Sequence, residues 1–164
     1  MGLRAGWRNA VTVLLLGIGM TVAAATAPNV ALKDFTGKDR NASEFIGKGK
    51  WTVVVLWAHN CPICKQEIHQ MSFFHDAHRK KDATVLGVSV DGYANKELAQ
   101  GFVDEHALNF PNLLIEPEGV AQFGAGRLIG TPTYYIYAPD GKFVAKKIGA
   151  ATQEQIEAFM RDGK

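Results

Sequence analysis

The chain has 164 residues, of which 47% are hydrophobic and 21% are charged, values typical of one soluble globular domain. Its 18 basic and 16 acidic residues give a net charge of only +2 without a dense basic stripe, which argues against nucleic acid as a partner. Two cysteines are too few for a disulfide-scaffold protein, which needs several bridges spread along the chain.

The first 25 residues are predicted to be a secretory signal peptide. Arg4 and Arg8 precede an uncharged run over 11–25, and Ala23-Ala24-Ala25 offers an Ala-x-Ala cleavage pattern. The run is shorter than the about 20 residues that span a bilayer comfortably, which favours cleavage after Ala25 over an uncleaved membrane anchor. We therefore expect an exported protein of the periplasm, with residues 26–164 as its domain and, without Arg4 and Arg8, 16 basic and 16 acidic residues.

Strands and helices are predicted to alternate along the remaining chain. The entry segment 26–50 holds a short strand near 30–32 and one helical turn at 43–46, and the apolar, β-branched run 51–58 is typical of a strand buried on both faces. The later elements are helices at 62–80, 95–106, 118–123 and 152–161, and strands at 84–90, 112–115, 133–138 and 143–148. Pro139-Asp140-Gly141-Lys142 predicts a hairpin turn, and Thr152 a helix N-cap. This order predicts an α/β fold, with a central mixed sheet and helices on both faces.

The motif Cys61-Pro62-Ile63-Cys64 lies between the strand at 51–58 and the helix that follows it. Pro62 suits the first helical position, so Cys61 is placed at the helix N-terminus, where unpaired N–H groups stabilise a thiolate. A thiolate is the attacking species in disulfide exchange. The motif therefore predicts that Cys61 is the nucleophile and that Cys64, one turn further on, resolves the mixed disulfide.

Other interpretations of the cysteine pair are weaker. A structural disulfide that closes so small a loop constrains the unfolded chain very little. A zinc site would need a second Cys or His pair at ligand spacing. A c-type haem site needs His directly after the second cysteine, where this chain has Lys65. A redox pair that works without a bound cofactor is the preferred interpretation.

Thr131-Pro132-Thr133, just before the strand at 133–138, is the second candidate element. A cis Pro132 would hold the backbone facing the cysteines, and Thr131 would then pair its main chain with an extended substrate segment. An ordinary turn proline is the alternative, because most X-Pro bonds are trans.

Together these residues resemble the thioredoxin superfamily, and within it the exported TlpA/ResA-like thiol–disulfide oxidoreductases. The resemblance covers about residues 28–162, and its matching stretches are 32–38, 53–58, 61–67, 130–133 and 140–142. It implies a thioredoxin fold, Cys61 as nucleophile, Cys64 as resolving residue and Pro132 as the cis proline. It also implies protein substrates that carry disulfides or thiols, a membrane thiol reductase as electron donor, and often a role in cytochrome c maturation.

The chain departs from the family pattern beside the cysteines. The residue before the first cysteine, usually Trp in the family, is Asn60 here. Glu67 matches a carboxylate of some ResA-like members, and helical spacing puts it near Cys64, where it would exchange a proton unless it is a solvated surface residue. His59 would stabilise the Cys61 thiolate when protonated, or hydrogen-bond a substrate, unless it is simply an exposed loop histidine.

Three functions compete at this stage. The first is reversible dithiol–disulfide exchange with protein substrates, as a reductase. The second is an oxidant of the same fold that inserts disulfides, which a very strongly stabilised Cys61 thiolate would indicate. The third is a copper-handling protein in which Cys61, Cys64 and His59 bind Cu(I), because soft thiolates suit that ion. A peroxidase is the weakest option, because no Thr-x-x-Cys pattern is present.

Overall fold

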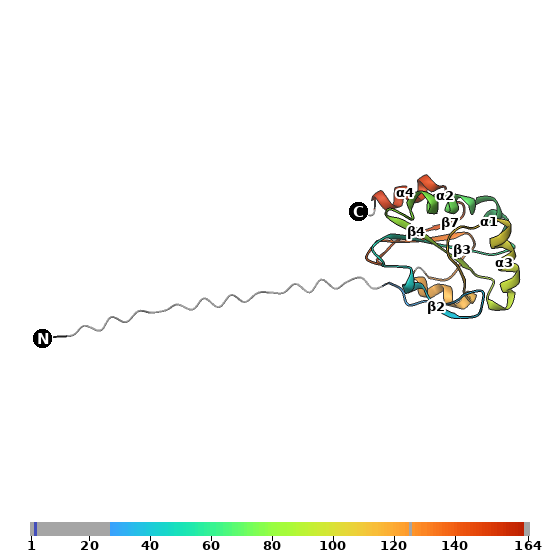
Figure 1. The fold of residues 1–164 in the computed structure, drawn as a ribbon, viewed down its shortest axis with the longest axis horizontal. Coiled ribbons are helices and arrows are strands. Elements are labelled where there is room, and N and C mark those ends of the chain that lie inside the picture. Colours follow the sequence, from blue (N-terminus) through green and yellow to red (C-terminus); the bar gives the residue numbers. More distant parts are fainter. Residues whose placement is uncertain (1, 3–26, 125, 163–164) are drawn as a thin grey trace.

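The computed structural model describes Gly2, residues 27–124 and residues 126–162, so the signal peptide expected at 1–25 lies, apart from Gly2, outside the described residues. The chain forms a seven-stranded mixed sheet in the order β2-β1-β5-β4-β3-β6-β7 (Figure 1). The strands are β1 (Ala31–Lys33), β2 (Asp39–Asn41), β3 (Trp51–Trp57), β4 (Ala83–Ser89), β5 (Asn112–Leu114), β6 (Thr133–Tyr137) and β7 (Phe143–Ile148). Within the described part of the chain, no helix is both long and apolar enough to cross a membrane.

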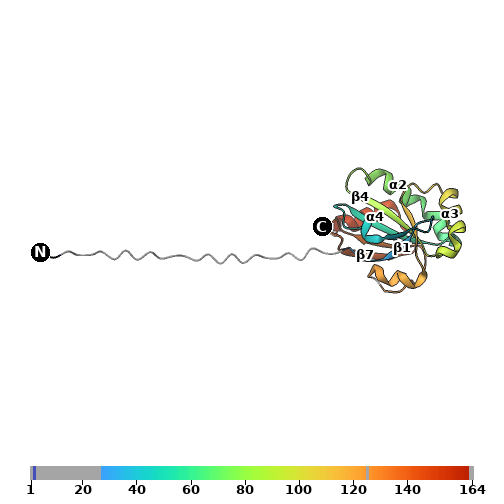
Figure 2. The ribbon, with the colours of Figure 1, turned by 60° about the horizontal axis from the view of Figure 1, so that its bottom comes forward.

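The two faces of the sheet are covered by different kinds of helix. The α-helices are α1 (Pro62–Glu67), α2 (His69–His78), α3 (Lys96–Glu105) and α4 (Gln153–Asp162), and the 3-10 helices are η1 (Ala42–Glu44), η2 (Tyr93–Asn95) and η3 (Pro117–Phe123). The buried side chains of the α-helices pack in one core cluster, and those of η1 and η3 pack in a second cluster on the opposite face. Figure 2 shows η3 on the far side of the sheet from α2 and α3.

Strand β3 lies in the interior of the sheet, as its apolar sequence predicts. All seven of its residues are buried, with β4 parallel on one side and β6 antiparallel on the other. Val53, Val55 and Trp57 belong to the α-helical core, and Val54 and Leu56 belong to the other core. Because β3 and β4 are parallel, their carboxyl ends meet at one edge of the sheet, where the loop to α1 begins.

Most expected elements are present, with two differences. The helix expected over 62–80 is interrupted at Ile68, where the N–H of Met71 donates to the carbonyl oxygen of Ile68 at 3.0 Å, a tighter i to i−3 bond. The second difference is β2, which pairs with β1 as an antiparallel hairpin. Its sequence, Asp-Arg-Asn, has none of the apolar alternation that reveals a strand, so the sequence prediction was wrong to leave it out.

Two of the three histidines of α2 serve packing between elements, whereas His69 is exposed. His75 is buried and its Nδ1 accepts a hydrogen bond from the N–H of Val85 on β4 at 3.3 Å; burial lowers the pKa of His75, so it stays neutral. His78 joins α2 to α4, with Nδ1 2.8 Å from Asp82 and Nε2 3.0 Å from Glu157. Burial alone would lower the pKa of His78, but the hydrogen bonds with Glu157 and Asp82 outweigh it and raise the pKa above its usual value.

Candidate active site

Cys61 and Cys64 form a disulfide at the point where the β3 loop enters α1. Their Cα atoms are 5.2 Å apart, and Pro62 is the first helical residue. Cys61 is the N-cap of α1, and its Sγ accepts a hydrogen bond from the N–H of Cys64 at 3.1 Å. Cys61 is 7% exposed and Cys64 is 0% exposed, so of the two residues only Cys61 retains any exposure.

The loop before β6 lies directly against Cys61. The Thr131–Pro132 peptide bond is cis, and the carbonyl oxygen of Thr131 is 3.3 Å from Cys61 Sγ, although the two residues are 70 positions apart. The carbonyl oxygen of Pro132 accepts the N–H of Gly149 at 2.9 Å, which ties this loop to the end of β7. The Thr131 main chain therefore lies directly beside the Cys61 sulfur.

Glu67 is half-buried at the end of α1, one helical turn after Cys64. Burial raises the pKa of the Tyr134 hydroxyl on β6, and the negative charge of Glu67 adds to this shift. The carboxylate is thus close enough to the core to influence a buried phenol. The role of Glu67 in proton exchange with Cys64 stays a prediction.

His59 meets an acidic residue that the sequence analysis did not select. Asp91 follows β4, and its Oδ1 lies 2.7 Å from Nδ1 of His59, which precedes Cys61 by two residues. The signal for Asp91 was its place directly after a buried strand, since the carboxyl ends of parallel strands share one edge of the sheet. Among the described residues, no group of three or more His, Cys, Asp or Glu side chains is placed to hold a metal ion.

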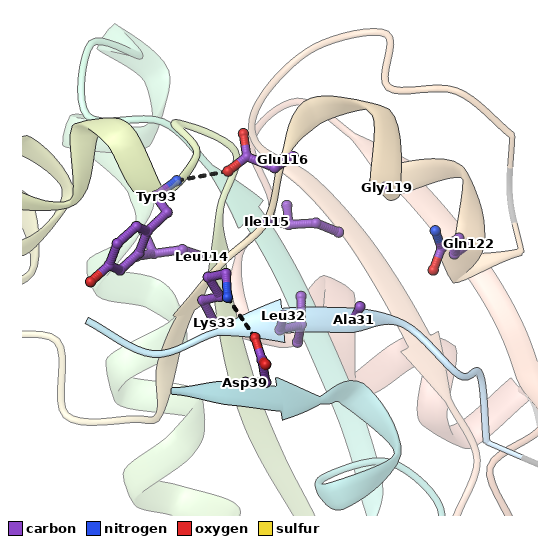
Figure 3. Close-up of a pocket in the computed structure, with 10 residues that line it drawn as sticks. All are labelled: Ala31, Leu32, Lys33, Asp39, Tyr93, Leu114, Ile115, Glu116, Gly119 and Gln122. Atoms are coloured by element: carbon purple, nitrogen blue, oxygen red, sulfur yellow. Dashed lines mark hydrogen bonds and ion pairs between the residues drawn. The ribbon is translucent and has the colours of Figure 1, made fainter. Parts of the chain in front are cut away.

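A cavity of about 240 Å³ lies apart from the disulfide, between β1, η3 and the loop after β4 (Figure 3). Its floor is apolar, and its rim holds the ion pair of Lys33 with Asp39 at 2.5 Å and the bond from the Tyr93 N–H to Glu116 at 3.0 Å. Its lining residues are Ala31, Leu32, Lys33, Asp39, Tyr93, Leu114, Ile115, Glu116, Gly119 and Gln122. Neither cysteine is among them, so the dithiol does not open into this cavity.

The chain has relatives among known protein families. The AhpC/TSA family profile matches residues 23–146. The chain belongs to the AhpC/TSA family. This family member is 27% identical over 137 residues to the thiol-disulfide oxidoreductase ResA of Bacillus thuringiensis (strain Al Hakam), covering 82% of this chain and 75% of the relative. It is 28% identical over 116 residues to the sporulation thiol-disulfide oxidoreductase A of Bacillus subtilis (strain 168), covering 70% and 69%.

Solved structures share the fold of this AhpC/TSA family member. A thioredoxin-family thiol:disulfide interchange protein from Chlorobium tepidum TLS has a TM-score of 0.70 at 20% identity, covering 85% of this chain and 96% of that chain. StoA from Bacillus subtilis has a TM-score of 0.63 at 27% identity, covering 83% and 99%. The expected thioredoxin-like fold is confirmed, and the curated relatives confirm the expected enzyme class, a protein-disulfide oxidoreductase.

Proposed function

We propose that the chain is an exported thiol–disulfide oxidoreductase that reduces protein disulfides with Cys61 and Cys64. The observation that carries the proposal is the unequal placement of the two sulfurs. Cys61 keeps a small exposed fraction, 7%, with Sγ held by the N–H of Cys64, whereas Cys64 is fully enclosed behind it. One sulfur is therefore available to a substrate and the other only to its partner, as two-step exchange requires. Export is supported by the pattern of residues 1–25.

The reaction begins with the reduced pair. The Cys61 thiolate attacks one sulfur of a substrate disulfide, forms a mixed disulfide and releases the other substrate sulfur as a thiolate, which then takes up a proton. Cys64 then loses its proton and attacks Cys61 Sγ, which releases the second substrate thiol and forms the Cys61–Cys64 disulfide. The hydrogen bond from the Cys64 N–H at 3.1 Å stabilises the negative charge on Cys61, since an N–H bond to an ionised acceptor is stronger than one to a neutral acceptor.

The surroundings of Cys61 favour a protein as substrate. Ile63, between the cysteines, and Ile129, two residues before Thr131, are both exposed apolar side chains. Exposed apolar groups beside a reactive atom suit contact with another protein. The Thr131 main chain beside Cys61 Sγ is placed to pair with an extended substrate segment that carries the disulfide or thiol.

The electron donor in this proposal is a membrane thiol reductase, and the dithiol itself is the only redox group, with no bound cofactor. The relatives named thiol-disulfide oxidoreductase ResA and sporulation thiol-disulfide oxidoreductase A support thiol–disulfide chemistry. A role in cytochrome c maturation or in the redox balance of the cell envelope is part of the proposal and rests on the family resemblance of the sequence. In the opposite direction the protein would insert disulfides into its substrates, and the reduction potential distinguishes the two directions.

The reduction potential of the Cys61–Cys64 couple tests the proposal. The protein without residues 1–25 is equilibrated against glutathione or dithiothreitol, and its oxidised fraction is measured by thiol alkylation and mass spectrometry. We expect a value near that of thioredoxin, about −270 mV. A value near about −120 mV would make the protein an oxidant and contradict the reductase assignment. A pair that forms no reversible disulfide would contradict both directions.

Glu67→Gln is expected to slow the second half of the reaction by about 100-fold, the lower end of what a general acid–base residue contributes. The amide keeps the shape of Glu67 but cannot take the proton that Cys64 must lose. The measurement is the decay rate of the mixed disulfide between pH 5 and pH 9. Glu105→Gln, an exposed residue at the end of α3, is the matched control and should leave the rate unchanged. A pH profile for Glu67→Gln identical to that of the unchanged protein would show that Glu67 is a solvated surface residue with no part in the proton transfer.

A further inference from the structure

A nearly buried carboxylate beside the cysteine loop has no part in the exchange steps described so far. The side chain of Asp91 is 7% exposed. Its Oδ2 accepts hydrogen bonds from the His59 main-chain N–H at 3.0 Å and from the Ser89 hydroxyl at 2.6 Å, while its Oδ1 lies 2.7 Å from His59 Nδ1. Burying a carboxylate is costly unless hydrogen-bond donors surround it, and these donors hold the Asp91 side chain in one position.

Two elements bring this carboxylate to the cysteines. Trp57 at the end of β3 is in register with Ser89 at the end of β4, and the Val90 N–H donates to the Trp57 carbonyl oxygen at 2.9 Å. The following turn closes with the Cys61 N–H donating to the Ala58 carbonyl oxygen at 3.1 Å. His59 lies inside this turn. Bonds to Asp91 therefore hold both the main chain and the ring of a residue in the turn that positions Cys61.

The contact with Asp91 also selects one form of the imidazole. An ionised carboxylate only accepts hydrogen bonds, so the proton of neutral His59 is on Nδ1. The other nitrogen, Nε2, then carries a free lone pair that can take up a proton. The His59 side chain is 30% exposed, so solvent can reach it. After strand β4, the charged group that faces His59 is Asp91. In the turn that contains His59, the neighbouring titratable group is Cys61.

We propose that Asp91 is a positioning residue for disulfide exchange, acting by orienting His59 so that Nε2 carries the proton of the first step. Nε2 takes the proton when the Cys61 thiol ionises, and the resulting imidazolium is stabilised by Asp91. Cys61 Sγ then forms a bond to one substrate sulfur while the substrate S–S bond breaks, and the imidazolium gives its proton to the departing thiolate. The proposal rests on the proposed reductase function and adds two residues to it.

The test compares His59→Gln, Asp91→Asn and the double variant with the unchanged protein. The rate constant for reduction of oxidised glutathione by the reduced protein is measured between pH 5 and pH 9, together with the pH profile of Cys61 alkylation. We expect a loss of about 100-fold near neutral pH for His59→Gln. We expect about tenfold for Asp91→Asn, since a group that orients a catalytic side chain contributes about 10- to 100-fold. Both alkylation profiles should move to higher pH.

The double variant separates positioning from a merely structural effect. If Asp91 acts through His59, adding Asp91→Asn to His59→Gln causes no further loss. Multiplying losses, or an alkylation profile that does not move, would overturn the proposal. His78→Gln is the matched control, because His78 also bonds carboxylates, Asp82 and Glu157, but joins α2 to α4. It should leave the alkylation profile unchanged.

A measurement on the unchanged protein covers the case in which Asp91→Asn does not fold. Long-range ¹H–¹⁵N spectra report which ring nitrogen of His59 carries the proton, and we expect Nδ1. A proton on Nε2 would overturn the proposal without any variant. Failure of the reductase function itself has a different signature, because the unchanged protein would then reduce no disulfide, whatever the state of His59.

Discussion

Cys61→Ser is expected to reduce disulfide exchange to the uncatalysed background, whereas Cys64→Ser is expected to complete the first step and then stall. Cys61 keeps a small exposed fraction, 7%, whereas Cys64 is fully enclosed. Without Cys61 no thiolate reaches the substrate. Without Cys64 the mixed disulfide between Cys61 and the substrate has no internal group to resolve it, so it accumulates. Non-reducing electrophoresis and mass spectrometry with a protein disulfide as substrate would show the trapped species with Cys64→Ser only.

The opposite behaviour of the two variants would also give a clear answer. A mixed disulfide that accumulates with Cys61→Ser would make Cys64 the nucleophile and contradict the assignment from exposure. Both variants remove the disulfide, so the reduced unchanged protein is the control for stability. Because the bridge closes a loop between residues only 3 apart, its loss should change the free energy of unfolding little.

Gly87→Ala is expected to have the largest effect on stability, about 3 kcal/mol of lost unfolding free energy from overpacking and a broken buried hydrogen bond. A Cβ at Gly87 would lie 1.9 Å from Oδ1 of Asn112 and 2.9 Å from the ring of Phe110. That Oδ1 accepts the indole N–H of fully buried Trp57 at 3.1 Å, and the Asn112 amide donates to the Phe110 carbonyl oxygen at 2.8 Å. Asn112 therefore cannot move without losing both bonds.

Urea unfolding of the oxidised protein, followed by tryptophan fluorescence, measures this effect. Gly101→Ala is the control, since Gly101 lies in helix α3 and a Cβ there would meet nothing within 4 Å. It should stabilise the protein by about 0.5–1 kcal/mol, because alanine favours the helix. A Gly87→Ala protein as stable as the unchanged one would show that Asn112 is free to rearrange and that the buried indole bond contributes little.

The strand that leads into the cysteine turn also contributes to the stability of the protein. Trp57 ends β3 immediately before the turn to Cys61, and its indole is held by Asn112 on β5. A substitution that displaces Trp57 is expected to disturb the turn as well as the core. The reduction potential of Gly87→Ala, measured where the protein is still folded, would report that second effect separately from stability.

Several features were readable from the sequence because they depend on a few neighbouring residues. Pro62 at the first position of α1 and Cys61 as its N-cap follow from helix-start chemistry. Thr152 caps α4 as expected, with its hydroxyl accepting the Gln155 N–H at 3.3 Å. The hairpin turn at 139–142 closes through the Ala138 N–H to the Lys142 carbonyl oxygen at 2.8 Å. The uniform apolar run of β3 predicts burial on both faces for a similar reason, since its pattern lies within one strand.

Contacts between distant residues were decided by the tertiary structure, although the sequence already offered the approach of Thr131 to the cysteines as one of two alternatives. Asp91 meets His59 across 32 residues, Asn112 meets Trp57 across 55, and Thr131 meets Cys61 across 70. Each contact depends on strand order and register, which no local pattern of charge or hydrophobicity encodes. The sequence by itself determined the dithiol and the elements that carry it. The packing of β3 against β4 and β6 decided that the Asp91 carboxylate meets His59 and that the Thr131 carbonyl oxygen meets Cys61, because these groups come from neighbouring strands of the sheet.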